Sequence, residues 1–195
     1  MKLFALMALI ITTQTFALET GKPAADFALP SATGKTIKLS DYKGKTVVLE
    51  WLNHGCPFVR KHYDSNNIQT LQSTYTAKGV IWLSVISSAE GKQGYVDAQG
   101  AAAEKASNKS NATDILLDAK GTVGKAYEAK TTPHMYVINP QGELVYQGAI
   151  DDKASTDQAD VKGAKNYVAA ALDATLANKT VAMGSTKAYG CGVKY

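Results

Sequence analysis

Arginine is nearly absent from this chain. Arg60 is the single arginine among 195 residues, the other basic residues are lysines, and the formal net charge is only +4. Arginine is the usual side chain for forked phosphate contacts and for recognising base edges. A weak positive charge spread over many lysines gives no other reason to expect nucleic acid. We therefore expect no nucleic-acid partner.

The chain also has little that could hold it in a membrane. Lys2 is followed by the apolar residues 3–11, but threonine and glutamine interrupt the run at 12–15. That is short of the roughly 20 apolar residues that a membrane span requires. Thr15-Phe16-Ala17 resembles an imperfect signal-peptidase site. We expect residues 1–17 to be a signal peptide, residues 18–195 to form one domain, and the protein to be periplasmic or secreted, without a stable membrane anchor.

Only two cysteines are present, Cys56 and Cys191. His54 and His62 flank Cys56, but their spacing is not that of a zinc site. We expect no metal and no cofactor. In an oxidising compartment the two cysteines could form a disulfide, although export alone does not establish one.

The most informative segment that is present surrounds Cys56. Residues 46–53 are largely apolar and β-branched, which predicts a buried strand. His54-Gly55 predicts a turn, and Pro57 is placed where a helix would begin. A cysteine at a helix N-terminus, with Arg60 and Lys61 nearby, is expected to favour the reactive thiolate. The alternative is a buried structural cysteine.

The hydrophobic pattern predicts an α/β domain with a central mixed sheet flanked by helices. One βαβ unit comes first, and it implies two parallel strands joined by a crossover helix. An N-terminal extension precedes this unit, and an insertion and an antiparallel hairpin follow it. The expected strands are 27–29, 36–39, 46–53, 80–86, 114–118, 134–138 and 143–147, and the expected helices are 57–77, 95–106, 122–128 and 164–178.

Four segments together resemble a known family. They are residues 50–63, Thr132-Pro133-His134, residues 142–152 and Gly190-Cys191. With the element order, they resemble the thioredoxin fold and, more narrowly, the exported peroxiredoxin-like proteins of the alkyl hydroperoxide reductase/thiol-specific antioxidant family. The resemblance spans most of residues 20–195.

The resemblance implies roles for several residues. Cys56 would be the attacking cysteine, and Pro133 would be the cis-proline opposite it, which keeps a backbone edge free for a substrate chain. Glu50 falls where thioredoxins keep a buried carboxylate, although a surface position is the alternative. His54 could hydrogen-bond the thiolate or act as an acid or base, or it could be a solvated turn residue.

Two departures from the family patterns affect the chemistry. Val59 replaces the second cysteine of thioredoxins, so another thiol must resolve a mixed disulfide on Cys56. Typical peroxiredoxins also have proline and threonine or serine where this chain has Leu49 and Asn53, and a later arginine that this chain lacks. We expect Cys191 to be the resolving thiol, although a structural Cys56–Cys191 disulfide is the alternative.

The sequence therefore predicts an exported thiol-based oxidoreductase. Its partners would be a thiol reductant, a disulfide-bearing protein or a small hydroperoxide. A true thiol peroxidase and a non-catalytic binding module remain alternatives. Among the remaining polar residues, we expect His62 at the surface or against a loop, and Asp151 and Asp152 in a solvated turn.

Overall fold

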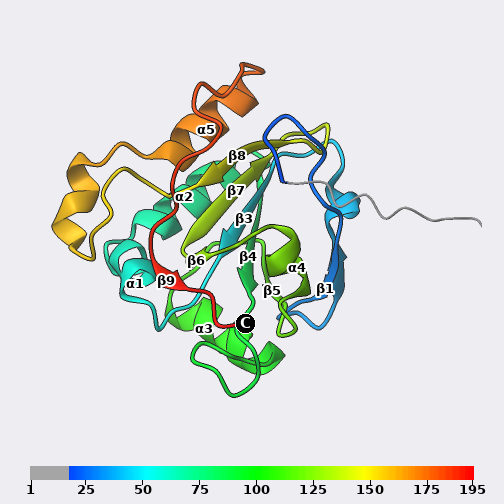
Figure 1. Cartoon of the computed structure of the whole chain (residues 1–195), viewed down its shortest axis with the longest axis vertical. Coiled ribbons are helices and arrows are strands. Elements are labelled where there is room, and N and C mark those ends of the chain that lie inside the picture. The colour runs from blue at the N-terminus through cyan, green and yellow to red at the C-terminus, as the bar shows by residue number, and fades with distance from the viewer. Residues whose placement is uncertain (1–17) are drawn as a thin grey trace, which may run out of the picture.

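The centre of the protein is a five-stranded mixed sheet, seen in the computed structural model, which describes residues 18–195 (Figure 1). The predicted signal peptide lies outside the described residues. Across the sheet the strands run in the order β5-β4-β3-β7-β8. Their bounds are β3 Val47–Trp51, β4 Ile81–Ile86, β5 Asp114–Leu117, β7 His134–Ile138 and β8 Leu144–Gly148.

The pairing within the sheet confirms the expected mixture of directions. β3 runs parallel to β4 and β4 parallel to β5, whereas β7 is antiparallel to both β3 and β8. Every residue of the central strand β3 is buried, as its largely β-branched and apolar sequence predicts for all but Glu50. The chain leaves the end of β3 directly into the turn before Cys56, so the central strand of the sheet positions that turn.

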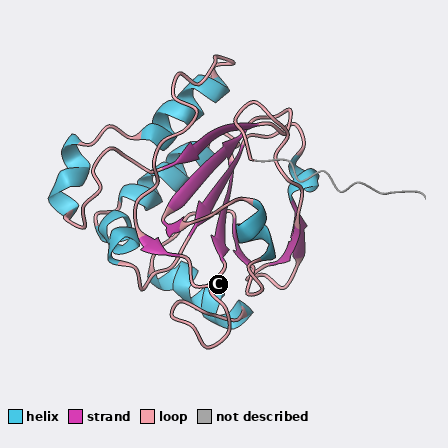
Figure 2. Ribbon diagram, in the orientation of Figure 1, coloured by secondary structure: helices cyan, strands magenta, loops and turns pink. Residues whose placement is uncertain are grey.

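Helices and the N-terminal extension cover the two faces of the sheet (Figure 2). α1, α2, α3 and α5 contribute buried residues to one apolar core. α4 and the N-terminal extension cover the other face. The helices are α1 Pro57–Asp64, α2 Asn67–Thr76, α3 Ala98–Ser107, α4 Thr122–Ala126 and α5 Tyr167–Leu176, with short 3₁₀ helices η1 Leu39–Tyr42 and η2 Gln158–Gly163.

Two small strand pairs lie outside the central sheet. β1 (Ala28–Pro30) pairs with β2 (Thr36–Lys38), as expected for the N-terminal extension. β6 (Thr131–Thr132) pairs with β9 (Cys191–Gly192), which the sequence analysis did not predict. The second pair joins the C-terminal segment to the segment just before Pro133.

The single helix expected over residues 57–77 is wrong, because the segment forms two helices. α1 ends at Asp64, and Asn66 takes a left-handed backbone conformation with φ of 60° before α2 begins. Asparagine tolerates this conformation better than most residues, so Asn66 permits a change of direction here. No helix in the described part of the chain is both long and apolar enough to cross a membrane.

Candidate thiol active site

Cys56 lies where the chain passes from the sheet into α1. It is the N-cap residue of α1, and Pro57 occupies the first turn, as the sequence predicts. Proline is well suited to this position because the first N–H groups of a helix have no partner within the helix. The Cys56 side chain therefore starts from a fixed backbone position at the positive end of the helix dipole.

Two groups lie against the Cys56 sulfur. The carbonyl oxygen of Thr132 is 3.1 Å from Cys56 Sγ, and the Sγ atom of Cys191 is 2.7 Å away. Both cysteines are free thiols. The Thr132–Pro133 peptide bond is cis, as the resemblance implied. The structure thus brings together Cys56, Pro133 and Cys191, which are far apart in the sequence.

The β6–β9 pair positions Cys191 beside Cys56. In this pair Cys191 is opposite Thr132, and Gly192 is opposite Thr131. Gly190 has φ of 143°, and a Cβ atom there would lie 2.1 Å from the Thr132 carbonyl oxygen. Only glycine has neither the steric penalty at this φ nor the Cβ that would clash. Gly190 therefore allows the C-terminal segment to approach β6 closely.

The pKa values of the two thiols are shifted in opposite directions. Burial would raise the pKa of Cys56, but hydrogen bonds from the Cys191 thiol and the Val59 N–H outweigh it and hold this pKa below its usual value. Burial and the adjacent Cys56 sulfur raise the pKa of Cys191 to about 11. Since the thiolate is the nucleophile, Cys56 is the better attacking group and Cys191 stays protonated beside it.

The expectation that Arg60 and Lys61 favour the Cys56 thiolate is wrong. The Arg60 guanidinium pairs with Asp64 and donates to the side-chain oxygen Oδ1 of Asn108 at 2.9 Å. The ammonium group of Lys61 donates to the backbone oxygen of Lys153 at 2.6 Å. Neither cation therefore accounts for the lowered pKa of Cys56, which comes from Cys191 and the helix N-terminus.

Glu50 is fully buried, so the surface alternative is wrong. Its carboxylate accepts hydrogen bonds from four side chains: Tyr63 at 3.0 Å, Gln72 at 3.2 Å, Trp82 at 2.8 Å and Ser84 at 3.1 Å. Burial raises the pKa of Glu50, and these four donors oppose the rise. The carboxylate is thus held in a fixed network between the sheet and α1 and α2, and no contact with Cys56 is among these bonds.

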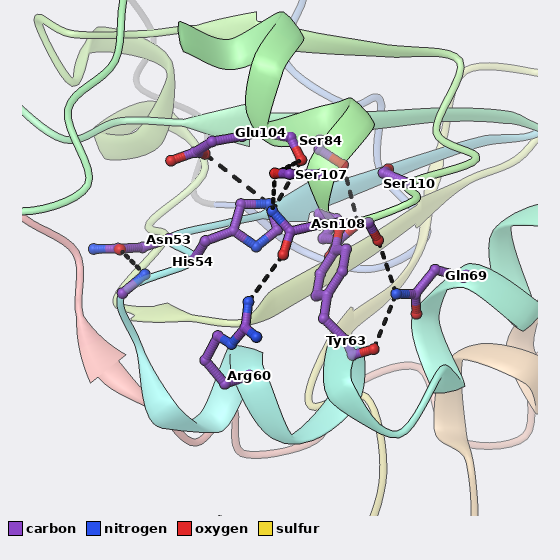
Figure 3. Close-up of polar contacts among 12 residues, drawn as sticks. Asn53, His54, Arg60, Tyr63, Gln69, Ser84, Glu104, Ser107, Asn108 and Ser110 are labelled. Atoms are coloured by element: carbon purple, nitrogen blue, oxygen red, sulfur yellow. Dashed lines mark hydrogen bonds and ion pairs between the residues drawn. The ribbon is translucent and has the colours of Figure 1, made fainter.

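His54 is buried against Tyr63 instead of being a solvated turn residue. Only 8% of its side chain is exposed, its ring meets the Tyr63 ring edge-on, and Nε2 lies 4.0 Å from a Glu104 oxygen (Figure 3). Neither ring nitrogen has a hydrogen-bond partner among the described residues, Cys56 included. Burial, aided by the charge of Arg60, lowers the pKa of His54 to about 4, so the ring is neutral near pH 7.

Asn53 supports the turn before Cys56. Its side-chain oxygen accepts the Gly55 N–H at 2.9 Å, and its amide donates to the backbone oxygen of Gln93 at 3.2 Å. A Cβ atom at Gly55 would lie 2.1 Å from the Gln93 amide nitrogen. The middle insertion thereby holds the turn. Asn53 stands where typical peroxiredoxins have threonine or serine, and its side chain here links the turn at Gly55 to Gln93 of the insertion.

A buried polar cluster near the site was missed. It consists of Lys61, His62, Asp151 and Tyr189, and the first three are buried. His62 packs against the C-terminal loop at Tyr189, so the loop position is confirmed and the surface position is wrong. The expected solvated position of Asp151 is also wrong. The C-terminal segment covers this region, and nothing in the local pattern predicted that cover. The one sequence signal was the closeness of Tyr189 to Cys191.

The two surface cavities lie away from Cys56, and the described residues form no metal site. Two surface cavities share Asn139, Pro140 and Gln141 in their linings. Ile138, just before them, pairs with Val47 at the start of β3, so both cavities lie at the end of the sheet opposite Cys56. Within residues 18–195, no three histidine, cysteine, aspartate or glutamate side chains are grouped to hold a metal ion.

Comparison with solved structures identifies similar folds. A hypothetical protein from Sinorhizobium meliloti is 25% identical, with a TM-score of 0.76 over 92% of this chain and 96% of that chain. An uncharacterised conserved protein from Geobacillus kaustophilus is also 25% identical, with a TM-score of 0.76 over 92% and 93%. A putative thiol:disulfide interchange protein DsbE from Chlorobium tepidum is 27% identical, with a TM-score of 0.55 over 80% and 99%.

These likenesses and the strand order confirm the thioredoxin-like α/β fold. No curated protein matches the chain. The model of the AhpC/TSA family matches residues 20–147, which include Cys56 and Pro133 but not Cys191. With its cysteine at the start of α1 and a cis-proline against it, the chain belongs to the AhpC/TSA family.

Proposed function

We propose that the protein is an exported thiol–disulfide oxidoreductase in which Cys56 is the nucleophile and Cys191 the resolving thiol. The observation that carries this proposal is the 2.7 Å separation of the two sulfurs, one with a lowered and the other with a raised pKa. Export rests on the pattern of residues 1–17. The DsbE-like neighbour, whose printed name is that of a thiol:disulfide interchange protein, supports the same chemistry.

The reaction has two exchange steps. The Cys56 thiolate attacks one sulfur of a substrate disulfide, forms a mixed disulfide and releases the other substrate sulfur as a thiolate. Cys191 then loses its proton and attacks the Cys56 sulfur, which releases the second substrate thiolate and forms the Cys56–Cys191 disulfide. The substrate gains two electrons and the protein loses two, so an external thiol reductant must restore the dithiol.

The geometry gives an order to these steps. The charge and hydrogen bond of the Cys56 thiolate contribute to the raised pKa of Cys191. Once Cys56 is in a mixed disulfide, it has no negative charge, and both contributions disappear. Cys191 therefore becomes easier to deprotonate only after Cys56 has reacted, which favours resolution over premature attack by Cys191.

A direct test uses the reduced protein and oxidised glutathione, followed by intact mass. We expect the wild type to lose two hydrogens and retain no glutathione, because Cys191 displaces it. Cys191→Ser should accumulate one glutathione on Cys56. Cys56→Ser should react much more slowly, because burial still raises the pKa of Cys191 when the Cys56 thiolate is absent. A wild type that accumulates the glutathione adduct without forming the internal disulfide would overturn the role of Cys191.

A further inference from the structure

The C-terminal strap, residues 189–195, lies over the reactive cysteine. It crosses the protein beside β6 and α1 (Figure 1). Beyond β9, the Val193 N–H donates to the Lys130 carbonyl, and the Tyr195 hydroxyl donates to the Ala129 carbonyl at 2.7 Å. Cys56 is 0% exposed under this cover, whereas Cys191 is partly exposed. A substrate disulfide cannot touch the Cys56 sulfur while the strap is in place.

The strap also occupies a backbone edge. β9 pairs with Thr131 and Thr132, and the Thr132 carbonyl lies against the Cys56 sulfur. An extended segment of another protein that brought its disulfide to Cys56 would need this same edge. The strap and such a segment therefore compete for one position.

Tyr189 attaches the start of the strap to a buried carboxylate. Its hydroxyl donates to Asp151 Oδ1 at 2.5 Å and lies 3.0 Å from His62 Nε2. Lys61 Nζ lies 3.6 Å from the other Asp151 oxygen and 5.5 Å from the centroid of the Tyr189 ring. The side chains of Lys61 and Asp151 are 0% and 1% exposed.

These charges have no part in the thiol exchange. A buried ion pair is often no more stabilising than apolar residues of the same size, so its presence is weak evidence for a role in stability alone. Here Asp151 Oδ2 has no hydrogen-bond partner among the described residues. Its Oδ1 receives the Tyr189 hydroxyl and the Lys153 N–H. Within residues 18–195, the strap thus supplies one of the two hydrogen bonds to this carboxylate.

We propose that the C-terminal strap is an intramolecular competitor of the disulfide-bearing segment that reacts with Cys56, and that Tyr189, held by Asp151, is the latch that controls how often the strap lifts. The partner is a protein with a disulfide in an extended segment that can pair with Thr131 and Thr132. This inference rests on the proposed function and adds a gate to it. Tyr189 is a positioning residue, because it acts on Cys56 only through the strap.

The test measures how fast Cys56 reacts with oxidised glutathione in Cys191→Ser protein, where Cys56 is the only thiol. Adding Tyr189→Phe keeps the ring and removes the hydroxyl that binds Asp151. We expect the rate to rise by about tenfold or more, as the loss of a hydrogen bond to a charged group implies. Tyr95→Phe is the control, because Tyr95 is exposed and lies outside the strap. An unchanged rate in folded Tyr189→Phe protein would overturn the latch.

A competitor peptide separates gating from general loosening of the fold. A synthetic peptide of residues 187–195 carrying Cys191→Ser should slow the reaction of the Tyr189→Phe protein, because it can refill the β6 edge. The peptide would not reverse a general destabilisation of the fold. If the peptide does not slow the reaction, the proposed competition is overturned. Gly190→Ala disturbs the close approach of the strap to the Thr132 carbonyl oxygen and serves as the second variant if Tyr189→Phe does not fold.

The outcomes also separate this inference from the proposed function. If Cys56 fails to react faster than an unfolded control in every variant, including those with the strap released, Cys56 is not an activated nucleophile and the proposed function fails. If Cys56 reacts readily but at the same rate in all variants, only the gate fails.

Discussion

At the scale of single residues, the reactivity of Cys56 depends on one neighbouring donor. Cys191 is the first of the groups that lower the Cys56 pKa against the effect of burial. Cys191→Ser keeps an O–H donor at this place, whereas Cys191→Ala removes it. We expect the pH midpoint for alkylation of Cys56 to be higher in Cys191→Ala than in Cys191→Ser, and the rate near pH 7 to be lower. Equal midpoints would show that the helix N-terminus alone activates Cys56.

Glu50 provides a second prediction at this scale. Its raised pKa means that the folded protein holds the proton more tightly than the unfolded chain. The contribution of Glu50 to the free energy of unfolding is therefore complete below its pKa in the unfolded chain, about 4.3. This contribution is lost as the pH rises through the pKa of Glu50 in the folded protein. Gln72, Trp82 and Ser84 can still donate to the side-chain oxygen of a glutamine.

We therefore expect Glu50→Gln to fold and to flatten this part of the pH dependence. The measurement is the free energy of unfolding in urea from about pH 4 to about pH 8, compared between the two proteins. Parallel pH curves for wild type and Glu50→Gln would show that Glu50 does not change its protonation on unfolding in this range.

At the scale of elements, we expect the β6–β9 pair to influence the equilibrium between the two thiols and a Cys56–Cys191 disulfide. Gly190→Ala would place a Cβ 2.1 Å from the Thr132 oxygen and force a non-glycine residue to φ of 143°. Such a backbone costs about 1–3 kcal/mol, so we expect the equilibrium constant for the Cys56–Cys191 disulfide to fall at least about fivefold in a glutathione buffer. Gly192→Ala is the matched control, since a Cβ there meets no atom within 4 Å. An equal loss in both variants would contradict this account of Gly190.

The same scale shows what could be predicted from the sequence. Residues 47–51 form the expected buried strand, and Pro57 begins the expected helix, because both signals are local. The break at Asn66 was missed, because asparagine permits a left-handed backbone conformation but does not require it. Asp151 was expected in a solvated turn, and Lys61 also belongs to a residue type that is almost never fully buried unless it is paired. Their burial depends on the strap, whose path cannot be inferred from local periodicity.

At the scale of the whole molecule, we expect the protein to reduce peroxides slowly. Peroxide reduction needs groups that polarise the O–O bond beside the thiolate. The single arginine is engaged with Asp64 and Asn108, Asn53 holds the Gly55 turn, and the strap buries the Cys56 sulfur. A hydroperoxide could still oxidise Cys56 to a sulfenic acid, from which Cys191 would form the same disulfide with release of water.

Since both substrates lead to one product, the rate distinguishes them. We expect hydrogen peroxide to react with reduced protein at least roughly a thousandfold below the diffusional ceiling of about 10⁸ M⁻¹s⁻¹. Stopped-flow loss of thiol under excess peroxide gives this constant, and Cys56→Ser is the control for reaction at Cys191. A constant near the ceiling would mean that another group polarises the peroxide and that the strap does not limit entry. The AhpC/TSA fold would then serve a thiol peroxidase here, and disulfide exchange would be the secondary activity.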